Sequence, residues 1–131
     1  SGDILFNIVG TPGIRTEVPT GIDEANITQT TARIRLDSNL INRRGVFWLL
    51  RSSFCKRQYR ILTKGSAQPG MNLEDVQKLL IPIGTPDQQS DLAKSLDELS
   101  NEYQRVQDHI EATRDLRFSC LNKMLGDYVV Q

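Results

Sequence analysis

A long stretch of the sequence without glycine or proline constrains the fold more than any other feature. It runs from Asp87 to Leu125. Within it, apolar residues recur at spacings of 4, 3, 4, 3 and 4, which is the a/d pattern of a helix that packs against a second helix. The stretch predicts one helix, about 58 Å long at 1.5 Å per residue, that stops at Gly126. The residues of this apolar seam are Leu92, Leu96, Leu99, Tyr103, Val106 and Ile110.

The apolar seam needs a partner, because soluble proteins rarely leave a continuous apolar stripe in water. The predicted helix is longer than the preceding residues could cover, so a partner helix on another chain is favoured. Three alternatives remain: a hairpin near Asp108–Thr113, a shorter helix, or packing of the seam on the chain's own domain. No turn residue supports the hairpin.

The residues before the long helix predict a small antiparallel sheet. Asp3–Val9 is a nearly continuous apolar run that ends at a Pro-Gly turn, and Arg15–Pro19 is a plausible return strand. Ile27–Leu36 alternates between one face for packing and one more polar face.

Two shorter helices are expected between the sheet and the long helix. Asn42 is a favourable N-cap for a helix over about 43–62, and Asn72 caps a second helix over Leu73–Leu80. Residues 65–70 form a loop by composition. The apolar face of the first helix is expected to contain Phe47, Leu50, Phe54 and Ile61.

The net charge of zero hides an asymmetry along the chain. Residues 1–64 contain ten basic and five acidic residues, whereas residues 65–131 contain six basic and eleven acidic ones. Residues 38–64 carry seven positive charges and no negative charge. This pattern predicts a part that faces a polyanion. The alternative is that these cations balance an acidic helix elsewhere in the fold, or complement a helix dipole.

Composition and motifs argue against several classes of protein. No segment is apolar enough to span a membrane, and no signal peptide is visible. The sequence lacks the phosphate-binding motif G-x-x-x-x-G-K-[ST] and the dinucleotide motif G-x-G-x-x-G. Its single histidine, His109, and its scattered carboxylates form no catalytic or metal-binding set. We therefore expect no catalytic residue, no metal and no cofactor.

Several segments together resemble one family. They are GDILFNIVGTPG (Gly2–Gly13), NITQTTARIRLDS (Asn26–Ser38), INRRGVFWLLRSS (Ile41–Ser53), GSAQPGMNLEDVQKLLIPI (Gly65–Ile83) and the glutamine-bearing turn Asp87-Gln88-Gln89. In this order they are similar to the DNA-specificity (S) subunit of type I restriction-modification systems. Family members usually read Ile-Pro-Ile-Pro-Pro before the helix, and here Gly84-Thr85-Pro86 follows Ile83.

The resemblance implies an architecture. In that family each unit is a target recognition domain followed by a long helix, and two such helices pack antiparallel as a spacer that docks methyltransferase subunits. The family's domain has a further part before the segment at Gly2, so this chain is expected to be the C-terminal part of one recognition domain with its spacer helix. The expected fold class is α+β: a small antiparallel sheet with packed helices, followed by one long coiled-coil-like helix. The expected divisions are a partial recognition domain (1–86), a spacer and dimerisation helix (87–126) and a tail (127–131).

The resemblance also implies a function without catalysis. The chain is expected to bind double-stranded DNA, to dock a methyltransferase subunit, and to form a homodimer or pair with another specificity half through the long helix. A cytoplasmic location follows, with Cys55 and Cys120 as reduced thiols. The alternative is a truncated interaction protein that dimerises without sequence-specific DNA binding. Because Arg, Lys and Gln contact phosphates and base edges, the candidate DNA-binding residues are Arg15, Gln29, Arg33, Arg35, Arg43, Arg44, Arg51, Lys56, Arg57, Arg60, Lys64 and Gln68.

Overall fold

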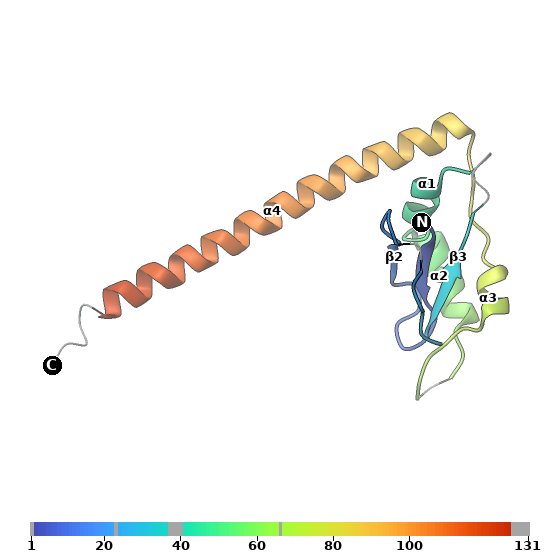
Figure 1. The fold of residues 1–131 in the computed structure, drawn as a ribbon, viewed down its shortest axis with the longest axis horizontal. Coiled ribbons are helices and arrows are strands. Elements are labelled where there is room, and N and C mark those ends of the chain that lie inside the picture. The colour runs from blue at the N-terminus through green and yellow to red at the C-terminus, as the bar shows by residue number, and fades with distance from the viewer. Residues whose placement is uncertain (1, 23, 37–40, 66, 127–131) are drawn as a thin grey trace. The chain divides into compact units, whose positions relative to one another are not determined.

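The computed structural model describes residues 2–22, 24–36, 41–65 and 67–126. It divides into two compact units, residues 1–93 and 94–131. The described part has a small antiparallel sheet, several helices and one long C-terminal helix (Figure 1). The expected α+β class is therefore confirmed. The predicted tail, 127–131, lies outside the described residues.

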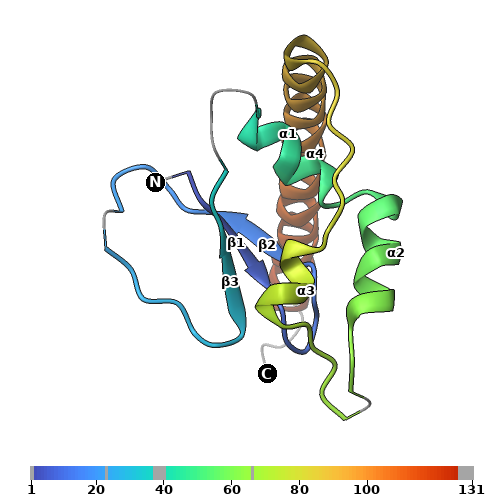
Figure 2. The same cartoon turned by 90° about the vertical axis from the view of Figure 1, so that its right-hand side faces the viewer.

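The sheet of the first unit has three short strands in the order β2-β1-β3 (Figure 2). β1 (Ile4–Asn7) lies in the middle and is antiparallel to both β2 (Arg15–Glu17) and β3 (Thr31–Ile34). Ile4 is opposite Glu17 on one side and Ile34 on the other. Alternate residues of β1 point inward, so Ile4 and Phe6 are buried.

The strands are shorter than the sequence pattern predicted. The strand expected over Ile27–Leu36 is regular only from Thr31, because a local turn precedes it. In this turn the amide of Thr31 donates to the carbonyl of Thr28 at 3.1 Å, and the hydroxyls of Thr28 and Thr30 lie 2.7 Å apart. Threonine hydroxyls can form such local hydrogen bonds, which compete with strand pairing although threonine is itself common in strands.

Two helices replace the single helix expected over about 43–62. α1 (Arg43–Leu49) begins at Asn42, whose side chain accepts from the Gly45 amide as predicted. α2 (Ser53–Leu62) has its own N-cap, Ser52, whose hydroxyl accepts from the Cys55 amide at 3.2 Å. Ser52 competes with the helix for backbone hydrogen bonds, and the prediction of one continuous helix was therefore wrong.

The break between α1 and α2 changes which residues face the core. The apolar face was expected to include Phe54 and Ile61, but these side chains are 41% and 79% exposed. Cys55 and Tyr59, four residues apart on α2, are buried instead. The core of the first unit consists of Ile4, Phe6, Ile8, Ala32, Val46, Leu50, Cys55, Tyr59 and Met71.

α3 (Leu73–Gln77) is shorter than the predicted Leu73–Leu80. Asn72 caps it as expected, and Asp75 completes a capping box. The helix stops early because the backbone of Leu80 is bound elsewhere. The side-chain amide of Gln58 donates to the Leu80 carbonyl at 2.8 Å and accepts from the Leu80 amide at 2.9 Å.

α4 (Pro86–Gly126) starts in the first unit and forms the described part of the second. Its beginning has the sequence of a capping box with proline at the first helical position. The amide of Thr85 donates to the Gln88 side chain at 3.0 Å, and the Gln88 amide donates to the Thr85 hydroxyl at 3.4 Å. The helix is continuous, so the prediction over Asp87–Leu125 is confirmed and the hairpin alternative is wrong.

Candidate nucleic-acid interface

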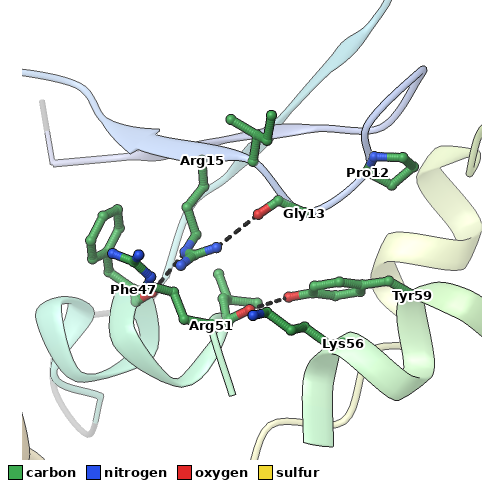
Figure 3. Close-up of a pocket in the computed structure, with 9 residues that line it drawn as sticks. Pro12, Gly13, Arg15, Phe47, Arg51, Lys56 and Tyr59 are labelled. Atoms are coloured by element: carbon green, nitrogen blue, oxygen red, sulfur yellow. Dashed lines mark hydrogen bonds between the residues drawn. The ribbon is translucent and has the colours of Figure 1, made fainter. Parts of the chain in front are cut away.

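Four of the candidate DNA-binding residues line one hollowed surface of the first unit. One cavity, of 410 Å³, is bordered by the turn after β1, by α1 and by α2, and contains Arg15, Arg51 and Lys56 (Figure 3). A second cavity, of 480 Å³, shares Lys56 with the first and adds Arg60. We call these two cavities together the basic groove. Their lining residues are Pro12, Gly13, Ile14, Arg15, Phe47, Leu50, Arg51, Lys56, Tyr59, Arg60 and Thr63.

No acidic residue is among those that line the basic groove in the described part of the chain. Nor does any carboxylate of the described residues form an ion pair with its four cations. The groove therefore concentrates positive charge on a surface with apolar walls. Such a surface attracts anions.

Arg15 is half-buried at the base of the groove and is held by two backbone carbonyls. Its Nε donates to the Phe47 carbonyl at 2.9 Å and its Nη1 donates to the Gly13 carbonyl at 2.7 Å (Figure 3). Burial lowers the pKa of this guanidinium, and the nearby positive charge of Arg51 lowers it further. The side chain nevertheless stays charged, because the ordinary pKa of arginine is 12.5 or higher.

Tyr59 and Gly13 shape the groove wall. The Tyr59 hydroxyl donates to the Leu50 carbonyl at 2.7 Å, and its ring packs edge-on against Phe6 with centroids 5.3 Å apart. Burial raises the pKa of Tyr59, so the hydroxyl remains a donor at neutral pH. Gly13 has φ of +101°, and a Cβ there would lie 2.9 Å from the Tyr59 ring. Only glycine suits both the backbone and this close approach.

Three arginine side chains stack on the two aromatic residues of α1, Phe47 and Trp48. The guanidiniums of Arg15 and Arg44 lie over Phe47, at 5.3 and 4.7 Å from the ring centroid. Arg44 and Arg51 lie over Trp48, at 5.4 and 5.3 Å. Arg44 also forms an ion pair with Glu17. Stacking restricts the arginine side chains while leaving their charges in place.

Arg33 and Arg35 lie outside the basic groove. Both are on the strand β3 side of the sheet and contact Asp3. Arg35 donates to the two carboxylate oxygens of Asp3 at 3.0 and 2.8 Å, and Arg33 lies 3.8 Å away. The hydrogen bond from Arg35 holds the pKa of Asp3 below its usual value. These two arginines line a separate cavity of 280 Å³ with Asp3 and Glu17, so that surface has mixed charge.

The remaining candidates are dispersed over the first unit. Gln29, Arg57 and Gln68 are exposed, and Arg43 is the half-buried first residue of α1. Lys64 lies 4.0 Å from the buried carboxylate of Asp75. The structure thus brings Arg15, Arg51, Lys56 and Arg60 together, and the other eight candidates do not line the same cavities.

The predicted helix interface lies along α4. Leu92 and Leu96 are half-buried, whereas Leu99, Tyr103, Val106 and Ile110 are 41% to 66% exposed. Further apolar side chains toward the end of α4 are also exposed: Leu116, Phe118, Leu121, Met124 and Leu125. The seam residues therefore lie along one helix, and most of their apolar side chains are exposed.

Sequence reasoning missed the role of Gln89, although the glutamine-bearing turn was noted. Its side chain is 4% exposed and joins two elements of the first unit. Its Oε1 accepts from the Asn42 amide at 2.8 Å, and its Nε2 donates to the Gly84 carbonyl at 2.9 Å. A Cβ on Gly45 would lie 3.2 Å from the Gln89 carbonyl oxygen. Gln89 therefore fixes the start of α4 against the start of α1.

Within the described residues, no group of histidine, cysteine and carboxylate side chains could hold a metal ion. None of the described helices has both the length and the apolar composition needed to cross a membrane. Neither the protein-family models nor the curated proteins contain a match to this chain.

Proposed function

We propose that the chain is a non-catalytic DNA-recognition and assembly module, similar to half of a specificity subunit of a type I restriction-modification system. The observation that carries this proposal is the basic groove, where four cations and no acidic residue line adjoining cavities of the described structure. The order of the sequence motifs supports the family. The module would act in the cytoplasm. Methylation and cleavage would be carried out by partner subunits, as in that family.

Phosphate contacts supply most of the affinity of a protein for DNA, and base contacts supply the specificity. The cations of the basic groove suit the first task. Arg57, the next residue on α2, is also exposed but lines neither cavity. Exposed Gln29 and Gln68 have side chains that read base edges.

The uncovered apolar seam supports an assembly role. Leu, Tyr, Val and Ile at a/d spacing pack against an equivalent stripe on a second helix. We propose that a second copy of the chain, or another specificity half, supplies this helix. The apolar side chains beyond Ile110 leave a further surface for a methyltransferase subunit.

The charges of α4 favour an antiparallel arrangement of two copies. Residues 86–111 contain seven acidic and two basic residues, whereas residues 112–126 contain three basic and one acidic. Antiparallel pairing along the whole of α4 brings residues 112–126 of one helix beside residues 86–100 of the other, which contain four acidic residues and one basic residue. Parallel pairing brings like charges together.

DNA binding by the intact chain tests this function. Fluorescence anisotropy with a labelled duplex, measured at several salt concentrations, should give a log–log plot with a steep negative slope. Reversal of Arg51, Lys56 and Arg60, which line the basic groove, to glutamate should weaken binding and make the slope shallower. The control reverses Lys94, Arg105 and Lys123 on α4, which changes the net charge equally. Equal loss in both triple variants would contradict a contact at this surface.

The second candidate is a truncated interaction protein that dimerises through α4 and does not bind DNA specifically. The exposed seam favours it as much as it favours the first. Dimerisation without salt-dependent DNA binding would select this second function.

A further inference from the structure

We infer that the 410 Å³ cavity of the basic groove is a discrete site for one phosphate group. This inference deepens the proposed function, because the phosphate expected there belongs to the DNA backbone. It separates one built site from the general positive charge of the surrounding surface. Arg15, Arg51 and Lys56 are the residues that would hold the phosphate.

Arg15 is the fixed part of this site. Two of the five N–H groups of a guanidinium bind the carbonyls of Phe47 and Gly13, which sets the orientation of the side chain. Its other N–H groups have no partner among the described residues. Because arginine presents its donors in a rigid fork, a guanidinium held in this way is ready for a phosphate oxygen.

The charge of Arg15 also lacks compensation. The side chain is half-buried, and no carboxylate of the described residues pairs with it. A charge taken partly out of water without a counter-ion is unfavourable. The lowered pKa of Arg15, caused first by burial, has the same origin. An anion in the cavity would supply the missing counter-charge.

Arg51 and Lys56 approach the same cavity from other elements. Arg51 follows α1 and stacks on Trp48, and Lys56 is on the first turn of α2. In Figure 3 these two side chains lie across the cavity from the strand that carries Arg15. Three cations from separate elements around one cavity suit a compact anion. The apolar walls, which include Pro12 and Leu50, suit the sugar carbons next to a backbone phosphate.

A pair of adjacent residues on α2 provides a matched test. Lys56 and Arg57 are both exposed, and neither forms an ion pair with a described residue. Only Lys56 lines the cavity. Lys56→Gln and Arg57→Gln therefore remove the same charge from neighbouring positions. Circular dichroism of both variants verifies that the fold is intact.

The chain's single tryptophan reports on the site, because Arg51 stacks on Trp48. Inorganic phosphate is titrated at constant ionic strength while Trp48 fluorescence is followed, and a labelled DNA duplex is titrated by anisotropy. We expect saturable phosphate binding. Lys56→Gln should raise the Kd for phosphate and duplex by about tenfold, as for loss of one charge-assisted hydrogen bond, and Arg57→Gln should raise it by less than about twofold.

The two ligands distinguish failure of the site from failure of the function. Duplex binding that falls equally in both variants, without phosphate binding, would overturn the site and leave DNA binding by diffuse charge. Phosphate binding that requires Lys56, without duplex binding, would support the site, assign it to a free phosphate compound and overturn the proposed function. Binding of neither ligand would overturn both.

Discussion

At the scale of single residues, Gln89 stabilises the first unit more than its sequence position indicates. It satisfies two backbone groups that belong to different segments, the amide of Asn42 and the carbonyl of Gly84. A buried backbone group without a partner costs about 1–3 kcal/mol. The sequence shows a glutamine near a helix start, where a solvated side chain is the ordinary expectation. Its burial depends on the approach of α1, which one sequence does not reveal.

Replacement of Gln89 tests this role. Gln89→Met keeps the approximate volume but removes both hydrogen bonds, so the free energy of unfolding should fall by about 2 kcal/mol. Urea denaturation followed by circular dichroism measures the change. Gln77→Met, at an exposed position at the end of α3, is the control and should change stability by less than about 0.5 kcal/mol. A similar, small effect of both substitutions would show that the Gln89 contacts do not stabilise the fold.

At the scale of elements, local capping determines the boundaries that hydrophobic spacing left open. The apolar spacing from Phe47 to Ile61 fits one helix and predicted one. Ser52 divides it, which turns α2 so that Cys55 and Tyr59 are buried. This rotation also places Lys56 and Arg60 at the groove. The site therefore depends on a cap that the spacing does not encode.

Removal of the cap gives an element-scale prediction. Ser52→Ala should lower the free energy of unfolding by about 1 kcal/mol, because the amide of Cys55 loses its side-chain acceptor. Thermal denaturation detects this as a lower Tm. Ser53→Ala changes the exposed first residue of α2. This substitution should leave the free energy of unfolding nearly unchanged. If Ser53→Ala destabilises as much as Ser52→Ala, then Ser52 is not the residue that starts α2.

The elements differ in how far the sequence predicts them. The predicted bounds of α4 were correct almost to its ends, because its caps, its uninterrupted length and its periodicity all indicate the same helix. The length of the strand expected over Ile27–Leu36 was overestimated. Its threonines alternate as in a strand, but they also stabilise the turn at Thr28–Thr31. The twelve candidate DNA-binding residues were selected by charge and side-chain type. Four of them meet at the basic groove, and Arg33 and Arg35 are bound to Asp3 instead, a pairing that requires the fold.

At the scale of the whole molecule, the proposed function connects two features that lie in different units. The basic groove belongs to the first unit, and most of the apolar seam belongs to the second. If two chains pair through their seams, a single assembly presents two basic grooves to one duplex. Binding of the second groove is then intramolecular, and the affinity of the pair exceeds that of one chain. A change confined to the seam should therefore weaken DNA binding without any change in the groove.

Leu99→Asp tests this connection, because a carboxylate in the middle of the seam opposes helix pairing. Light scattering should give twice 14.8 kDa for the unchanged chain and 14.8 kDa for the variant. DNA affinity of the variant should fall by about tenfold or more. Asn101→Asp introduces the same charge two residues away, about 200° around the helix, and should alter neither mass nor affinity. A monomeric Leu99→Asp variant that binds DNA with full affinity would show that each groove acts alone, and a monomeric unchanged chain would exclude the homodimer. In the second case the long helix would have to serve a partner other than a second copy of this chain.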